Sequence, residues 1–127
     1  MLVDTDVLIW HLRGYRQATR RLDELPNLIL SAMSYLELVQ GMRNKDELIA
    51  VQRMLELRRA NVLPLTPEIT RRATELMETL ALSHGLQAAD ALIAATALEH
   101  QLPVLTGNRR HFEAVGGLGI EGFLIQS

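Results

Sequence analysis

Three carboxylates lie at positions where packing alone does not explain a negative charge. Asp4 ends the apolar start of the chain, Glu37 lies between two leucines, and Asp90 interrupts the Ala/Leu/Ile-rich stretch 86–98. A polar residue, Asn108, follows a fourth apolar stretch. Carboxylates that a fold brings together from such distant segments repel one another strongly unless a cation lies between them. The first hypothesis is therefore a metal-dependent site.

The composition limits which metal and which chemistry are available. The chain has no cysteine, so disulfides, thiolate metal sites and cysteine nucleophiles are excluded. Oxygen ligands remain, and they suit Mg²⁺ or Mn²⁺. The length of 127 residues and the apolar fraction of 48% fit a soluble globular protein, so we expect one domain over residues 1–127.

The charge and hydropathy patterns bear on partners and location. The net charge of −2 argues against coating nucleic acid through bulk electrostatics. Twelve of the thirteen cationic residues are arginine, whose planar fork suits phosphate, so local nucleic-acid contact stays open. The chain shows no basic-then-apolar leader, and no uncharged apolar stretch reaches the ~18 residues of a membrane span. We expect a cytoplasmic protein with no membrane segment.

Short apolar runs alternate with longer helical patterns along the chain. We expect strands near 1–3, 28–30, 61–65, 102–106 and 120–124, helices near 6–13, 15–25, 34–42, 45–59, 66–84 and 88–100, and a short helix beginning at 108. This alternation predicts an α/β fold with a parallel sheet covered by helices on both faces. Sites in such folds lie at the carboxyl ends of the strands, where Asp4 and Asn108 fall directly and Glu37 falls within one helical turn.

Several of these polar residues also have structural interpretations. Ser34 and Glu37 have the S-x-x-E spacing of a capping box, which explains Glu37 as well as a functional role does. Asp6 is placed to cap the first helix, an alternative to metal contact. The Thr5 hydroxyl could bond Asp4, a metal-bound water or the local backbone.

Asp90 has no comparable structural explanation. It shares a helix face with the apolar residues Leu86, Ile93, Ala94 and Ala97. A lone carboxylate buried there would cost several kcal/mol or take up a proton. The first turn of a helix returns only about 0.3–1 kcal/mol, so a cation or a strong donor is required.

The histidines are interpreted as surface or packing residues. They share no ligand spacing such as H-E-x-x-H, and they are His11, His84, His100 and His111.

Four segments together resemble one known family. They are 2–9 (LVDTDVLI), 34–38 (SYLEL), 89–97 (ADALIAATA) and 105–112 (LTGNRRHF). They occur in the order and at the spacing found in PIN-domain proteins, and the chain is similar over essentially its whole length to ribonuclease toxins of the VapC type from bacterial toxin–antitoxin pairs. Each segment alone is a weak signal, whereas four in order are specific.

The resemblance implies a compact α/β/α fold and a catalytic site. It carries Asp4, Glu37 and Asp90 over as an acidic site for one or two Mg²⁺ or Mn²⁺ ions. There a metal-activated water would hydrolyse RNA phosphodiesters. Thr5 matches the small hydroxyl residue after the first Asp of the family, and Thr106 matches the threonine near the last strand.

One position departs from the family pattern. Many members have a fourth acid two residues after that threonine, whereas here Asn108 stands there. An amide brings no charge, so a single metal is expected, with Asn108 and Thr106 positioning water or a phosphate oxygen. Arg109 and Arg110 follow directly, either as contacts to RNA phosphates or as the solvated start of a helix.

The resemblance also implies protein partners. A small antitoxin encoded beside this chain would wrap it with a helix and tail, and a homodimer is expected. An exposed apolar groove could include Trp10, Leu36 and Val39, although the same three residues also fit the core.

Two other functions remain as alternatives. The D-x-D-x-V start also fits haloacid-dehalogenase-like phosphatases with Asp4 as nucleophile, but Lys45 is the only lysine and no late acidic pair follows. The second alternative is a non-catalytic binding module of PIN fold, in which Asn108 marks a decayed site.

Overall fold

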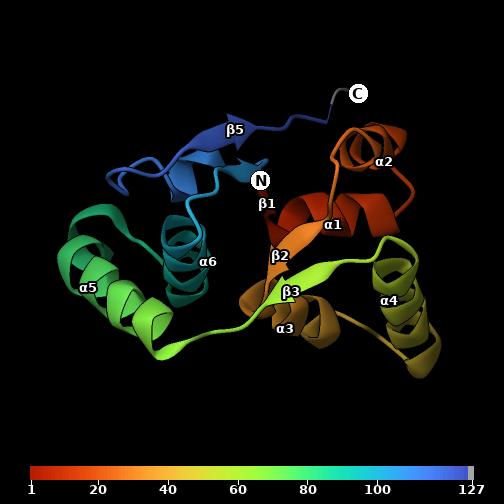
Figure 1. Ribbon diagram of the computed structural model, residues 1–127, viewed down its shortest axis with the longest axis horizontal. Helices are drawn as coiled ribbons and strands as arrows, with labels where there is room; N and C mark the ends of the chain where they lie inside the picture. The colour runs from red at the N-terminus through yellow and green to blue at the C-terminus, as the bar shows by residue number, and fades with distance from the viewer. Residues whose placement is uncertain (126–127) are drawn as a thin grey trace.

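The computed structural model describes residues 1–125, in which one parallel sheet separates two layers of helices (Figure 1). Its five strands are β1 (Leu2–Val3), β2 (Ile29–Ser31), β3 (Asn61–Leu63), β4 (Val104–Thr106) and β5 (Ile120–Gly122). Their order across the sheet is β3-β2-β1-β4-β5, and every neighbouring pair is parallel. The predicted α/β class with a parallel sheet is confirmed.

Six α-helices and a short 3₁₀-helix connect the strands over these residues. They are α1 (Thr5–Leu12), α2 (Arg16–Asp23), α3 (Ala32–Gln40), α4 (Lys45–Leu57), α5 (Pro67–His84), α6 (Ala88–Glu99) and η1 (Arg109–His111). In Figure 1, α5 and α6 lie on one side of the strands, and α1, α2 and α4 lie on the other. No helix within residues 1–125 is both long and apolar enough to cross a membrane.

The alternation of side chains along each strand divides the core between the two faces. In β1, Leu2 joins the cluster under α6, while Val3 joins the cluster under α1, α2 and α4. In β4, Val104 and Leu105 divide in the same way. Because successive side chains of a strand point to opposite faces, these short apolar strands are buried on both sides. Packing on both faces therefore fixes the positions of the central strands and of the residues that directly follow them.

Two strands are shorter than the sequence predicted. Strand β3 ends at Leu63 instead of 65, and β4 begins at Val104 instead of 102. A proline adjoins each observed end, Pro64 after β3 and Pro103 before β4. Proline has no N–H to donate to the ladder, so it limits the length of both strands.

Helix α3 begins two residues earlier than predicted. Ser31 is its N-cap and its hydroxyl accepts the Met33 N–H at 3.0 Å. Ser34 therefore lies inside the helix, fully buried, and of the two alternatives for Glu37 the capping box with Ser34 is wrong. Two serines three residues apart both suited a cap, and the chain caps the helix as soon as it leaves β2. Glu37 consequently has no capping role.

Helix α1 is capped by Asp4 and not by Asp6. The Asp4 Oδ1 accepts the Thr5 N–H at 2.8 Å, and α1 begins at Thr5, directly after the end of β1. Of the two alternatives for Asp6, the helix cap is wrong, since Asp6 lies in the first turn. Asp6 is therefore available for contacts outside the helix.

Gly107 lies where the loop after β4 passes against α1. A Cβ at this position would lie 2.5 Å from Cη2 of Trp10 and 2.8 Å from Oδ2 of Asp6. The Trp10 ring cannot yield freely, because it packs against Phe123 with ring centroids 5.6 Å apart. Only glycine lets the loop approach α1 this closely.

We expect Gly107→Ala to lower the melting temperature by about 5 °C, because overpacking of this kind costs about 1–3 kcal/mol. Gly116→Ala is the matched control, since nothing lies within 4 Å of a Cβ at Gly116. Thermal unfolding followed by circular dichroism measures both variants. Equal melting temperatures would contradict the close approach of loop and helix.

Candidate active site

The three carboxylates gather at the carboxyl-terminal edge of the sheet. Asp4 follows β1 directly, and the neighbouring strand β4 ends at Thr106. Glu37 lies in the second turn of α3, and Asp90 lies in the first turn of α6. Burial is the largest cause of the raised pKa of Asp4 and of Asp90. Repulsion from Glu37 adds to the shift of Asp4, and repulsion from Asp4 and Glu37 adds to that of Asp90. The residues predicted from distant segments are thus brought into one electrostatic site.

Asp4 is the most deeply buried acid of this site, with 5% of its surface exposed. Its Oδ2 accepts the Thr106 hydroxyl at 2.7 Å, in addition to the Thr5 N–H on Oδ1. Burial nevertheless raises the pKa of Asp4, because two hydrogen bonds do not replace its lost hydration. The Thr106 hydroxyl also accepts the Asn108 N–H at 2.9 Å, so it links Asp4 to the loop that follows β4.

Glu37 is held by a chain of hydroxyl groups. The Thr5 Oγ1 lies 2.8 Å from Oε1 of Glu37 and 3.0 Å from Oγ of Ser34. A hydroxyl has one proton to donate, and a carboxylate only accepts. The Thr5 hydroxyl therefore donates its hydrogen bond to Glu37 and accepts one from the Ser34 hydroxyl. The order of donation is therefore Ser34 to Thr5 to Glu37. The role of Ser34 has no local sequence signal, because its position within the helix depends on where α3 begins.

Asp90 is only partly buried, and its closest charged neighbour is a histidine. Its side chain is 15% exposed, and Oδ2 lies 3.4 Å from Nδ1 of His111. Burial raises the pKa of Asp90 to about 6, against a lowering by His111. The interpretation of His111 as a surface or packing residue is incomplete, because it is half-exposed and also contacts the site. Its position in η1, just after Asn108, is the sequence signal that could have identified it.

Asp6 and Asn108 bond to each other. The Asp6 Oδ2 accepts the Asn108 side-chain amide and the Gly107 N–H, both at 3.0 Å. Burial, together with repulsion from Asp4, raises the pKa of Asp6 to about 7. The amide of Asn108, which stands where many family members have a fourth acid, is therefore directed at Asp6.

Arg109 and Arg110 lie next to the site on η1. Both are exposed, and Nη1 of Arg109 lies 3.5 Å from the carbonyl oxygen of Ile120. They are accessible to a ligand approaching the sheet edge.

The chemistry of the donor set fits a hard divalent cation. The side chains are carboxylates, and repulsion adds to the effect of burial in raising the pKa of Asp4 and of Asp90; a cation between the carboxylates would relieve this repulsion. In the part of the chain that the structure describes, no three acidic or histidine side chains form a compact ligand cluster. Two carboxylates are instead bonded to donors of their own chain, Glu37 to Thr5 and Asp6 to Asn108.

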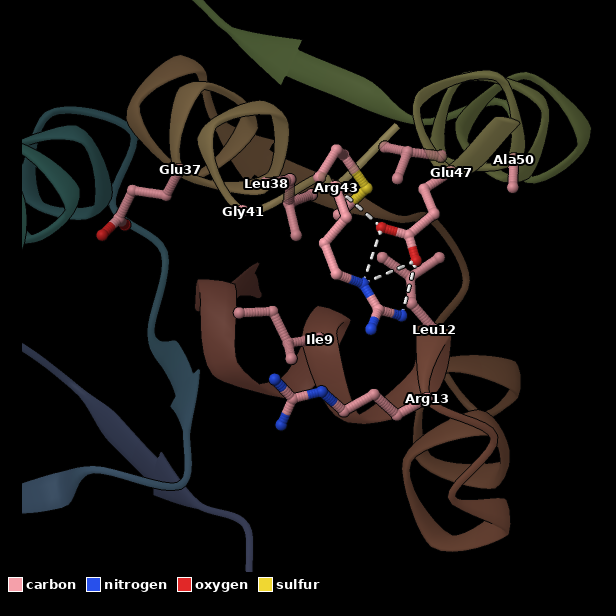
Figure 2. A pocket seen from close by; sticks show the side chains of 11 residues that line it. Ile9, Leu12, Arg13, Glu37, Leu38, Gly41, Arg43, Glu47 and Ala50 are labelled. Atoms are coloured by element: carbon pink, nitrogen blue, oxygen red, sulfur yellow. Dashed lines mark hydrogen bonds and ion pairs between the residues drawn. The ribbon is translucent and has the colours of Figure 1, made fainter. Parts of the chain in front are cut away.

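A groove of about 450 Å³ adjoins this site between α1, α3 and α4 (Figure 2). It is lined by Ile9, Leu12, Arg13, Glu37, Leu38, Gly41, Met42, Arg43, Glu47, Ala50 and Val51. Arg43 and Glu47 form an ion pair of 2.8 Å, and the Glu37 carboxylate points away from this pair in Figure 2. Glu37 therefore belongs both to the groove and to the acidic site.

The residues predicted for such a groove were different ones. Trp10 and Val39 are half-buried, and Trp10 packs against the core beneath α1. Leu36 is 54% exposed. None of the three lines this groove, so the suggested members of an apolar groove are wrong.

Comparison with known proteins identifies the class to which this fold and site belong. The PIN domain profile matches residues 1–118, and the chain belongs to the PIN-domain family. Over 116 residues it is 40% identical to Ribonuclease VapC10 of Mycobacterium tuberculosis (strain ATCC 25618 / H37Rv), covering 88% of this chain and 85% of that protein. Ribonuclease VapC19 of the same strain is 37% identical over 117 residues, covering 87% and 90%.

A solved structure shares the fold. A toxin–antitoxin complex from Klebsiella pneumoniae contains a chain that superposes with a TM-score of 0.77 and 26% identity, over 92% of this chain and 93% of that one. The predicted resemblance to PIN-domain proteins of the VapC type is confirmed.

The raised pKa values predict how the stability of the metal-free protein depends on pH. Burial raises the pKa of Asp6 to about 7 and that of Asp90 to about 6, from an ordinary value of 3.8. Between these values the folded state holds more protons than the unfolded state, so the free energy of unfolding falls as pH rises from about 4 to about 7. In EDTA we expect the melting temperature to be about 5 °C higher at pH 5 than at pH 7.5.

The same measurement on Asp90→Asn should give a smaller pH dependence, because one of the shifted groups is removed. Glu113→Gln, a change at an exposed position, should leave the dependence as it is. A melting temperature that rises steadily from pH 5 to pH 7.5 in EDTA would contradict the raised pKa values.

Proposed function

We propose that this chain is a metal-dependent endoribonuclease that acts as the toxin of a toxin–antitoxin pair. The observation that carries the proposal is the set of mutually repelling carboxylates of Asp4, Glu37 and Asp90 at one edge of a PIN-domain sheet. The names of the relatives VapC10 and VapC19, both ribonucleases, support the substrate class. The chain belongs to a different family from the haloacid-dehalogenase-like phosphatases, which removes that alternative.

Each acid has a distinct role in this proposal. Asp4 and Asp90 would hold a Mg²⁺ or Mn²⁺ ion, since they flank the sheet edge from β1 and α6. Such a cation would lower the pKa of a water and offset charge on the phosphate. Glu37 would orient the attacking water or join the ligand set, and the Ser34–Thr5 chain of hydroxyls sets the direction of its carboxylate.

The neighbouring residues position the acids and the RNA. Thr106 fixes the direction of Asp4 through its 2.7 Å hydrogen bond. Arg109 and Arg110 are exposed beside the site and contact backbone phosphates of the RNA, a role that gives affinity and not sequence choice.

We expect Asp4→Asn and Asp90→Asn each to reduce RNA cleavage in Mg²⁺ or Mn²⁺ at least about 100-fold. Even residues that only orient a metal ligand are worth about 10–100-fold, and these two are the proposed ligands themselves. Asp46→Asn, at an exposed position of α4, is the control and should cleave like the wild type. The assay is gel mapping of RNA fragments.

Two outcomes would overturn this assignment. Cleavage that survives in the Asp4→Asn/Asp90→Asn double variant would show that these acids do not carry the reaction. Wild-type protein that neither cleaves RNA nor binds Mn²⁺ in calorimetry would favour the alternative of a non-catalytic module.

The antitoxin partner follows from the groove and from the Klebsiella complex. The apolar floor of the groove suits the apolar face of a helix, and Glu37 at its end suits a basic side chain of that partner. A small protein encoded beside this chain is the proposed occupant, in keeping with the toxin–antitoxin complex to which the fold is similar. The homodimer remains a prediction from the family, and light scattering tests it.

Filling the groove should abolish capture of that partner. Ala50→Trp places an indole into the groove from α4, whereas Gln52→Trp adds the same ring to an exposed position of the same helix outside it. We expect the co-expressed neighbour protein to co-purify with Gln52→Trp but not with Ala50→Trp, while both variants still cleave RNA. Equal co-purification would place the partner elsewhere.

A further inference from the structure

The Asp6 carboxylate is bonded from both ends of the chain. Oδ1 accepts the Val7 N–H at 2.8 Å, and Oδ2 accepts the Gly107 N–H and the Asn108 amide, each at 3.0 Å. A carboxylate offers about four acceptor positions, so three of the four are used by the protein itself. Two of these bonds join the first turn of α1 to a loop about one hundred residues later.

We propose that Asp6 and Asn108 form a latch that holds the loop 107–111 on α1 and closes the fourth-acid position to a second cation. Asp6 is a positioning residue in this proposal and not a metal ligand. The amide of Asn108 donates to Oδ2 of Asp6. A carboxylate at position 108 could come equally close to Asp6 only with a proton or a cation between the two groups. The exclusion of a second cation rests on the proposed metal-dependent function, whereas the bond between Asp6 and Asn108 does not.

The latched loop lies between groups that contact two of the acids. Before it, Thr106 is the last residue of β4, and its hydroxyl donates to Asp4 at 2.7 Å and accepts the Asn108 N–H at 2.9 Å. At the end of the loop, His111 lies 3.4 Å from Asp90. The sheet sets the position of Thr106, whereas the latch sets the position of His111 with respect to Asp90.

Packing keeps the loop near α1 but does not orient the Asn108 amide. Gly107 lies against Trp10, which fixes the approach of loop and helix. Asn108 itself is exposed, and no intrahelical bond holds its side chain as a cap of η1. The bond to Asp6 is thus the contact that selects the direction of this side chain.

A reciprocal exchange of the two residues tests the latch. In EDTA, Asn108→Asp opposes two carboxylates, and its melting temperature should fall by about 5 °C. The double variant Asp6→Asn/Asn108→Asp restores a bond between a carboxylate and an amide. It leaves one backbone N–H, of Val7 or Gly107, without its acceptor. We expect the double variant to recover about half of the fall in melting temperature caused by Asn108→Asp. Its melting temperature should therefore be higher than the summed effects of the two single variants predict.

Metal stoichiometry supplies a readout that a purely structural role would not change. By calorimetry we expect one Mn²⁺ per wild-type chain and two per Asn108→Asp chain, with a larger rise in melting temperature on Mn²⁺ addition for the variant. Asn108→Ala removes the donor without adding charge. It should bind one Mn²⁺ and lose about 2 °C, and it replaces Asn108→Asp in the stability test if that variant does not fold.

The outcomes separate this inference from the proposed function. Strictly additive melting temperatures in the exchange, or an Asn108→Ala variant as stable as the wild type, would overturn the latch. A single Mn²⁺ in Asn108→Asp would overturn the closed fourth position. Failure of the wild type to bind Mn²⁺ or cleave RNA would instead refute the proposed function, while recovery in EDTA would still support the latch.

Discussion

Asp4 is the point at which the sheet, the first helix and the candidate site are joined. One carboxylate oxygen caps α1 and the other accepts the hydroxyl of Thr106 at the end of the neighbouring strand. Strand β1 has only two residues before it reaches Asp4, so the turn from strand to helix occurs at the charged residue itself. Fixing this carboxylate therefore fixes the direction in which α1 leaves the sheet, and with it Thr5 and Asp6.

The carboxylates at the acidic edge lose hydration when the chain folds, and they repel one another. Burial is the first cause of the raised pKa of Asp4, Asp6 and Asp90, and mutual repulsion adds to it. The chain meets this demand with neutral donors from distant segments, namely the hydroxyls of Thr5 and Thr106 and the amide of Asn108. Neutral donors leave the negative charge of the site in place, which is what a cation-binding function requires.

The sequence predicted the order of elements and the carboxylates Asp4 and Asp90 because these depend on local patterns. Apolar runs and helical periodicity locate strands and helices, and a carboxylate on an apolar helix face has few structural explanations. The start of α3 was missed because Ser31 and Ser34 both suit a cap, and the choice depends on where β2 ends. The contacts of Thr5 with Glu37, Asp6 with Asn108 and His111 with Asp90 span 32, 102 and 21 positions, and no local pattern encodes them.

Glu37 connects the two surfaces that the proposed function requires. Its carboxylate accepts from Thr5 at the acidic edge, while its side chain also lines the groove between α1, α3 and α4. A basic group that enters from the groove and a cation held at the edge would both be attracted to the same carboxylate. Among the described residues, Glu37 caps no helix and accepts one hydroxyl, that of Thr5. Turning it away from the edge would cost this hydrogen bond, about 1.5–3 kcal/mol for a charged acceptor. That cost is comparable with a charge–charge contact in a partly buried site, about 4 kcal/mol at 4 Å, so a cation at the edge and a basic group in the groove would compete for this one carboxylate.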